Sequence, residues 1–250
     1  MARFFSRPDH GHSLLYRLGW YLAMAALWFV IGSVGLAAIY RFVPPPVTIT
    51  MVLDPNGFTK DWTPLTRIDR SMVDAVIAGE DAKFCDHNGF DQAGIAQALE
   101  RNLAGGKLRG GSTISQQTAK NVFLWQGTGW TRYARKALET WFTLVIETVW
   151  DKRRIMEVYL NVAETGIGTY GVEAGAQRYY RKSAARLTRV EARRSGRHRL
   201  YPPSWQCDRR AQPGGAQWRN GRLRLRIGRA WPAHGPPHRI LLRRAVCGKA

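Results

Sequence analysis

The feature that most constrains this chain is an uncharged stretch of 23 residues, from Leu18 to Tyr40, bracketed by Arg17 and Arg41. As a helix it would be ~35 Å long, enough to cross the hydrocarbon core of a bilayer with some tilt. A cleaved signal peptide is the alternative, but its apolar core would be only about 7–15 residues long. The sequence therefore predicts one transmembrane helix over residues 18–40.

Positive charges are distributed unevenly around this stretch. Arg3, Arg7 and Arg17 precede it, whereas Arg41 is the only basic residue after it until Lys60. Because basic residues favour the cytoplasmic side of a membrane, we expect residues 1–17 in the cytoplasm and the rest of the chain on the opposite side. In a bacterium, the chain would then be a single-pass protein of the inner membrane with its main domain in the periplasm.

The overall charge does not indicate a nucleic-acid-binding protein. The formal net charge is +20, but residues 1–192 contribute only +6 and residues 193–250 contribute +14. The excess of basic residues therefore belongs to the end of the chain, and we expect no nucleic-acid partner. With 45% apolar residues, the chain is too hydrophobic to be disordered throughout.

Residues 47–192 are predicted to form one mainly α-helical domain. A β-rich piece, Val47 to Leu53, comes first, and a turn at Asp54–Gly57 follows it. Apolar residues at helical spacing then recur along the chain. The first predicted helix begins at Ser71, with Asp74 at capping-box spacing. The later predicted helices are Asp91–Leu103, Thr113–Leu124, Thr131–Trp150, a helix that Asp151 caps and that ends at Val162, and a last helix that follows Gly166–Gly171 and ends at Tyr180.

The first cluster of polar residues lies at the end of the predicted helix that begins at Ser71. Glu80 and Asp81 are followed closely by Phe84 and His87. A carboxylate beside an apolar wall can have a raised pKa and act as a general base or acid. The alternative is a solvated helix end with no catalytic role, and the spacing alone does not decide between the two.

A second cluster lies where the predicted helix over 113–124 begins. Two glycines lead into Ser112 and Thr113, and Gln117 and Lys120 follow. Free N–H groups at a helix start, together with the positive end of the helix dipole, favour a bound phosphate. Lys120 could add a point charge. The alternative is an ordinary capped helix after a flexible loop.

A third cluster consists of Arg135, Lys136 and Glu139 on the predicted helix over 131–150. Positions 135 and 139 are one turn apart and share a face. Two cations beside a carboxylate suit an anionic leaving group, with or without a metal ion. The alternative is an ion pair on the helix surface, which is a common and weak feature.

Five sequence blocks together resemble glycosyltransferase family 51, the peptidoglycan polymerases. They are Glu-Asp-x-x-Phe-x-x-His-x-Gly at 80–89, Gly-Gly-Ser-Thr-x-x-Gln-Gln at 110–117, Arg-Lys-x-x-Glu at 135–139, Ile-x-Glu-x-Tyr-Leu-Asn at 155–161 and Tyr-Gly-Val-Glu-Ala at 170–174. Their order and spacing agree with the family over about residues 70–190. One anchor followed by one such domain is similar to the monofunctional members, because nothing in the chain reads as the transpeptidase domain of the bifunctional ones.

The resemblance implies a fold and a reaction. The fold would be mainly α-helical and lysozyme-like, with a small lobe that dips into the membrane. The acceptor would be the 4-hydroxyl of N-acetylglucosamine in lipid II, and the donor would be the growing lipid-linked glycan. Transfer would form a β-1,4 bond with inversion and release undecaprenyl diphosphate. The implied partners are lipid II, the lipid-linked glycan, the membrane and other cell-wall synthesis proteins.

The resemblance also implies roles for individual residues. Glu80 would be the general base, and Glu139 would assist at the diphosphate, directly or through a divalent cation such as Mg²⁺ or Mn²⁺. Lys120, Arg135 and Lys136 would neutralise the departing diphosphate, and Ser112, Thr113 and Gln117 would line the cleft. Phe84 and His87 would shape the site, and Asn161, Glu164 and Glu173 would be structural or would support the site residues.

Two other functions are compatible with parts of the pattern. A lysozyme-like hydrolase or lytic transglycosylase is related in fold and can use one glutamate as an acid. The paired Gln residues and the Arg-Lys-x-x-Glu block argue against it, because they suit a diphosphate that its substrate lacks. A catalytically inactive membrane scaffold is the non-enzymatic alternative.

The resemblance stops after about Ala192. Residues 193–250 contain 14 Arg, six Pro and seven Gly, with one acidic residue and no persistent apolar period. One interpretation is a basic tail that binds anionic lipid head groups. The abrupt loss of acidic residues favours the other, a shifted reading frame in a GC-rich gene, which would remove packing from the end of the domain. Reading the DNA in its other two frames downstream of codon 192 would decide between them.

Overall fold

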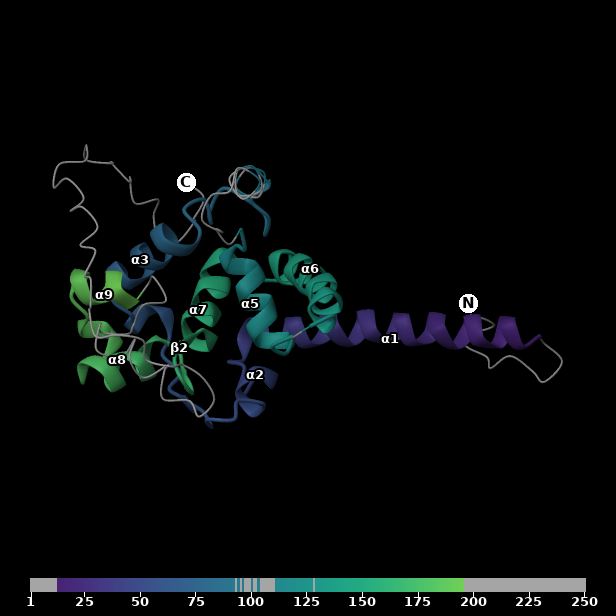
Figure 1. The fold of residues 1–250 in the computed structure, drawn as a ribbon, viewed down its shortest axis with the longest axis horizontal. Coiled ribbons are helices and arrows are strands. Elements are labelled where there is room, and N and C mark those ends of the chain that lie inside the picture. The colour runs from purple at the N-terminus through teal and green to yellow at the C-terminus, as the bar shows by residue number, and fades with distance from the viewer. Residues whose placement is uncertain are drawn as a thin grey trace, which may run out of the picture.

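The computed structural model describes residues 13–92, 111–127 and 129–195, together with the single positions 94, 96, 100 and 103. The predicted helix over 91–103, most of the loop that follows it and the chain beyond Ser195 fall largely outside the described residues. Within them the fold is mainly α-helical, as predicted (Figure 1). The helices are α1 (Leu14–Phe42), α2 (Ile49–Val52), α3 (Arg70–Glu80), α5 (Ile114–Phe123), α6 (Thr131–Val149), α7 (Lys152–Val162), α8 (Val172–Tyr180) and α9 (Arg189–Ser195), with short 3₁₀ turns η2 (Leu65–Arg67) and η3 (Ala184–Arg186).

The centre of the body is α5, which packs against α6 on one side and α7 on the other, while α3 packs against α9 (Figure 1). A small sheet lies beside this helical core. It consists of β1 (Thr59–Lys60), β2 (Glu164–Gly166) and β3 (Thr169–Tyr170), with β1 parallel and β2 antiparallel to β3. The core is closed by fully buried apolar side chains, among them Phe84, Met72, Ile114, Ile146, Ile155 and Leu160.

The central helices begin close to the positions that the sequence predicts. Thr113 caps α5 through a capping box with Gln116, and Asp151 caps α7 by accepting the N–H of Arg154 at 2.7 Å. For α3 the predicted capping box at Ser71 is wrong. The cap is Asp69, whose carboxylate accepts the Ser71 N–H at 2.8 Å, because a charged oxygen is a stronger acceptor than a hydroxyl.

The predicted β-rich piece over Val47–Leu53 is also wrong, because α2 is a single helical turn. Thr50 and Met51 of this turn are buried, and α2 packs against α5. The Thr50 hydroxyl lies 2.8 Å from that of Thr48. Tertiary packing therefore overrides the strand preference of these β-branched residues. The turn predicted after it is present, since the Gly57 N–H donates to the carbonyl of Asp54 at 3.1 Å.

Helix α1 is long and apolar enough to cross a membrane, and only 17% of its most apolar window is buried against the protein. It extends beyond the predicted span at both ends and projects from the body (Figure 1). Its second half packs along α6. The indole of Trp141 donates to the hydroxyl of Ser33 at 3.1 Å, and the indole of Trp150 donates to the carbonyl of Ala37 at 2.7 Å.

The end of α1 is fastened to the domain by two arginines. The guanidinium of Arg154 donates to the carbonyl of Tyr40 at 2.8 Å and to that of Val43 at 2.9 Å. Arg41 donates in the other direction, to the carbonyl of Val149. Because these contacts cap the carbonyls at the end of α1, the anchor and the body form one continuous packing unit.

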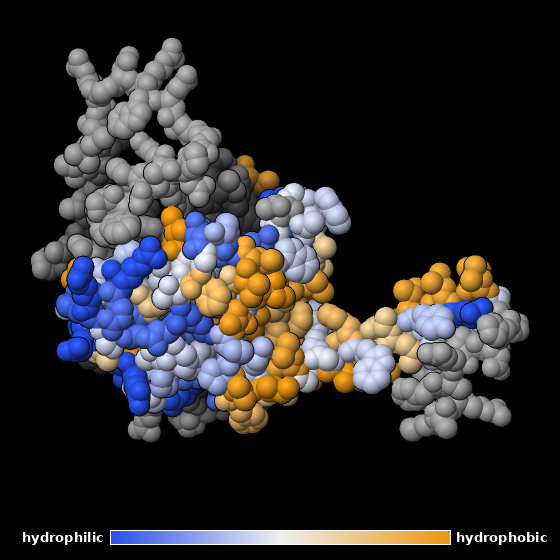
Figure 2. Space-filling view, turned by 90° about the horizontal axis from the view of Figure 1, so that it is seen from below, coloured by the Kyte–Doolittle hydropathy of each residue, from blue (hydrophilic) through white to orange (hydrophobic). Residues whose placement is uncertain are grey.

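Hydrophobic residues cover the part of the body next to α1, whereas the far end of the body is largely hydrophilic (Figure 2). The exposed apolar residues in and around α2 are Val47, Ile49, Val52, Leu53 and Phe58. An exposed apolar surface beside a helix of membrane-spanning length is typical of a protein that meets the bilayer surface.

Candidate active site

Glu80 is the last residue of α3, and its carboxylate contacts a side chain of α5. The side-chain amide of Gln117 donates to Glu80 Oε2 at 3.1 Å and lies 3.5 Å from the carbonyl of Ser112. Glu80 is half-buried, and its charge also reaches α7. Burial raises the pKa of Tyr159, and the negative charge of Glu80 raises it further. The structure therefore brings together the predicted residues Glu80, Ser112 and Gln117.

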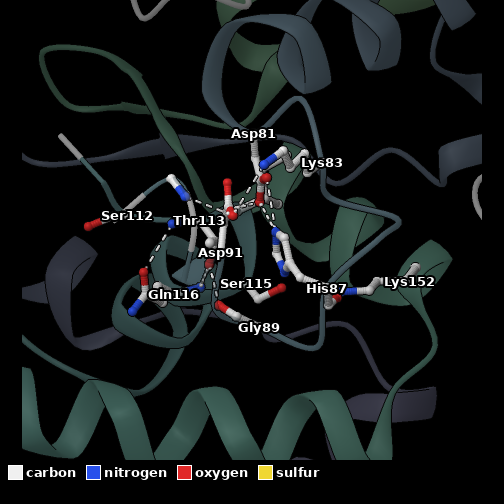
Figure 3. A network of polar contacts seen from close by, with 12 residues as sticks. Asp81, Lys83, His87, Gly89, Asp91, Ser112, Thr113, Ser115, Gln116 and Lys152 are labelled. Carbon is white, nitrogen blue, oxygen red and sulfur yellow. Dashed lines mark hydrogen bonds and ion pairs between the residues drawn. The ribbon is translucent and has the colours of Figure 1, made fainter. Parts of the chain in front are cut away.

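Asp81, next to Glu80, is buried and organises the loop that follows α3 (Figure 3). Its two carboxylate oxygens each lie 3.0 Å from Nε2 of His87, and one of them accepts the N–H of Ile114 at 3.1 Å. Ile114 is the first residue of α5, so a carboxylate of the protein sits at the positive end of this helix. Asp81 thereby fixes the direction in which the chain leaves Glu80.

Side chains of the protein accept two of the N–H groups at the start of α5, where a phosphate was predicted. The N–H of Ile114 is taken by Asp81, and the N–H of Gln116 donates to the hydroxyl of Thr113 at 3.2 Å. Thr113 is buried, and its own hydroxyl donates to the carbonyl of Gly89 at 2.6 Å. Two N–H groups of the helix start therefore have acceptors within the protein, and Thr113 supports the loop around Gly89.

A second buried network supports the same loop from α5, α6 and α7 (Figure 3). The ammonium group of Lys152 donates to Glu147 Oε1 and to the carbonyl of His87, both at 2.7 Å. Ser115 donates to the same carboxylate, and Lys152 lies 4.7 Å from the ring centroid of the fully buried Phe84. The sequence gives no signal for Ser115, Glu147 and Lys152, because no local spacing links residues that are so far apart in the chain.

The cationic cluster lies on α6 and is not a surface ion pair. Only 4% of the Glu139 side chain is exposed, and its carboxylate accepts from Arg135 Nη1 at 2.8 Å and from the ammonium group of Lys136. The side chain of Arg135 is 14% exposed and that of Lys136 48%. Nε of Arg135 is buried and has no hydrogen-bond partner among the described residues. The cluster therefore keeps donor capacity that the protein does not use.

Lys120 lies on α5, the helix that packs against the α6 helix of this cluster. Burial lowers the pKa of Lys120, and the nearby charges of Arg135 and Lys136 lower it further, while Glu139 and Glu164 act in the opposite direction. These shifts place Lys120 in the electrostatic field of α6 and of Glu164 at the start of β2. The structure thus groups Lys120, Arg135, Lys136 and Glu139, as the sequence predicted.

The residues around Glu139 do not fit a resident metal ion. Both oxygens of its carboxylate are already bonded to cations. Among the described residues, no group of three His, Cys, Asp or Glu side chains is placed to hold a metal. A divalent cation would have to displace Lys136 and take most of its ligands from a substrate diphosphate, as Mg²⁺ commonly does.

Two of the residues expected to be structural have structural contacts. The side chain of Asn161 accepts the N–H of Thr63 at 2.7 Å and donates to the carbonyl of the same residue at 2.9 Å. The buried carboxylate of Glu173 accepts the N–H of Ala184 at 2.7 Å. Glu164, in contrast, is exposed, and it lines a pocket of about 620 Å³ beside Asp54 and Tyr170.

Known proteins resemble the chain over most of its length. A family model described as transglycosylase matches residues 48–194. A biosynthetic peptidoglycan transglycosylase of Caulobacter vibrioides is 50% identical over 182 residues, which cover 72% of this chain and 78% of that protein. A protein of the same name from Pseudomonas aeruginosa is 46% identical over 211 residues, covering 81% of this chain and 87% of its own length.

Proposed function

Because the chain belongs to the transglycosylase family and is a peptidoglycan glycosyltransferase that polymerises glycan chains, we propose that it elongates a lipid-linked glycan with lipid II and uses Glu80 as its general base. One observation carries the assignment of the residues. Gln117, which bonds to Glu80, and Lys120, whose pKa the charges of the cationic cluster affect, are three residues apart on α5. Residues at this spacing share a helix face. A base and a cluster of cations therefore lie along one face of α5.

The chemistry follows from this arrangement. Glu80 accepts the proton of the 4-hydroxyl of the acceptor N-acetylglucosamine, and the oxygen attacks the anomeric carbon of the donor. The bond from that carbon to the undecaprenyl diphosphate breaks, its electron pair leaves with the diphosphate, and the anomeric centre inverts. Gln117, bonded to Glu80 Oε2, holds the carboxylate in place for this transfer.

The cationic cluster stabilises the charge that develops on the leaving diphosphate. Arg135 and Lys136 are held in place by Glu139, and Nε of Arg135 has no acceptor among the described residues. Lys120 adds a third positive charge from α5. We also predict that a divalent cation arrives with the diphosphate. An interaction with other cell-wall synthesis proteins is a further prediction.

The membrane placement of the chain is part of the proposal. Arg17 and Arg41 are 24 residues apart in α1, or ~36 Å, which matches a bilayer core with part of its head-group layers. With residues 1–17 in the cytoplasm, the body lies on the periplasmic side of the inner membrane. Its apolar surface around α2 then rests on the leaflet in which the lipid-linked substrates move.

The assignment is tested with purified full-length chain and lipid II. We expect glycan polymer, and we expect Glu80→Gln to lower the rate about 10²–10⁴-fold, the usual contribution of a general base. Asp74→Asn is the matched control, because Asp74 is exposed on the same helix. Digestion of preformed sacculi would support the hydrolase instead. A Glu80→Gln protein that polymerises like the control would refute the role of Glu80.

A further inference from the structure

A second pocket, of about 360 Å³, lies where α1 ends and meets the domain. Its lining combines three arginines with apolar side chains and two carboxylates. The lining residues are Arg41, Phe42, Leu65, Thr66, Asp151, Arg153, Arg154 and Glu157. None of the residues assigned to the glycosyl transfer takes part in this pocket, so its chemistry calls for a separate explanation.

The charges in this pocket leave a positive excess. Arg154 is paired with Glu157 at 2.5 Å, and the other oxygen of Glu157 accepts the N–H of Leu65 at 2.9 Å. Arg41, Arg153 and Asp151 remain, which gives one net positive charge. The exposed Arg153 makes no hydrogen bond or ion pair with any residue that the structure describes. Its guanidinium can therefore bind an anion at no cost in internal contacts.

The position of the pocket limits which anion it meets. Arg41 and Phe42 are the last two residues of α1, so the pocket lies at the level of the lipid head groups when α1 spans the bilayer. The Phe42 side chain beside it is 79% exposed. An exposed aromatic ring close to Arg153, which has no partner among the described residues, suits an amphiphile with an apolar chain and a phosphate at the same height.

We propose that this pocket binds the phosphate group of an anionic phospholipid at the end of the anchor helix. A phosphodiester carries one negative charge, which matches the net charge of the pocket, and arginine binds phosphate oxygens through its planar fork. The lipid would lie against Arg41 and Arg153, with its acyl chains along the exposed ring of Phe42. The proposal rests on the membrane placement of α1 but not on Glu80, so a chain inactive toward lipid II still tests it.

The experiment measures lipid binding to the full chain in detergent by native mass spectrometry. The probes are phosphatidylglycerol, phosphatidylcholine and inorganic phosphate. We expect one phosphatidylglycerol to bind saturably, and Arg153→Gln to weaken it about fivefold, the effect of one basic residue near a membrane surface. Arg153→Lys should keep part of the affinity, because lysine retains the charge but not the planar fork. The matched control is Arg186→Gln, an exposed arginine of η3, which packs against α8 at the end of the body away from α1.

Three results would overturn the proposal. One is equal binding of phosphatidylglycerol and phosphatidylcholine, which would mean that the charge of the head group is not recognised. Another is an Arg153→Gln protein that binds phosphatidylglycerol as the Arg186→Gln protein does. The third is inorganic phosphate that binds as tightly as the lipid, because the ligand would then be a free anion.

Discussion

Replacing Glu139 by glutamine removes the one negative charge that two neighbouring cations share. Arg135 and Lys136 both bond to the Glu139 carboxylate, which is buried in α6. Glutamine keeps the shape of the side chain and one acceptor oxygen, but not the charge. Arg135 and Lys136 would then both lose their carboxylate partner, and we expect both the stability and the polymerisation rate to fall.

The size of the stability loss follows from the exposure of the partners. Removing one member of a fully buried ion pair costs about 3–5 kcal/mol. Arg135 is 14% exposed and Lys136 is 48% exposed, so both can partly regain water. We therefore expect Glu139→Gln to lower the free energy of unfolding by about 2–3 kcal/mol. For a domain of this size that is a fall in Tm of about 4–12 °C.

A double-mutant cycle measures whether the loss comes from this pair. Thermal unfolding in detergent is recorded for the wild type, Glu139→Gln, Arg135→Gln and the double variant. The double variant should be less destabilised than the sum of the single variants, with a coupling energy of about 1–3 kcal/mol. Strict additivity, or an unchanged Tm for Glu139→Gln, would refute the counter-ion role and leave Glu139 with a purely chemical one.

Two further predictions concern the pH profile and the backbone. Because burial lowers the pKa of Lys120, this side chain should lose its positive charge at a lower pH than an ordinary lysine, and the polymerisation rate should decline as the pH rises through this range. In Lys120→Arg the charge persists, so the decline should move to higher pH. An unchanged pH profile of the variant would contradict this explanation. Gly171 has a φ of +87°, and a Cβ there would lie 2.9 Å from the carbonyl oxygen of Asn161, whereas Gly57 has a φ of +70° and open space around it. Gly171→Ala should therefore lower the free energy of unfolding by about 2–3 kcal/mol, and Gly57→Ala by about 1–2 kcal/mol. Equal losses in denaturation experiments would show that the short distance from position 171 to the Asn161 carbonyl has no cost.

The local signals in the sequence predict the central helices well. The cap at Thr113, the cap at Asp151 and the apolar spacing between them define α5, α6 and α7 nearly to the residue. These signals link residues that are only three or four positions apart, so they are visible in the sequence itself. The positive residues around Glu139 were also predicted as a group, because they lie one turn apart on a single helix.

The errors occur where distant parts of the chain decide the structure. The strand expected over Val47–Leu53 is instead a helical turn, since Thr50 and Met51 are buried and α2 packs on α5. The sequence assigns Asp81 no role of its own, yet its carboxylate contacts both His87 and Ile114 at the start of α5, 33 positions further along the chain. The one sequence signal for a role of Asp81 was its position directly after Glu80, in the 80–89 block that resembles the family.

The packing of α1 on the domain has a mechanical consequence. Helix α1 is bonded to the domain along several of its turns, through Trp141, Trp150 and Arg154. We therefore expect α1 and the domain to move as one rigid unit. In the proposed membrane placement, side-chain packing then sets the tilt of the domain and the height of Glu80 above the bilayer. A growing polymer would leave such an enzyme in a constant direction, and the substrates, not the catalytic domain, would do the moving.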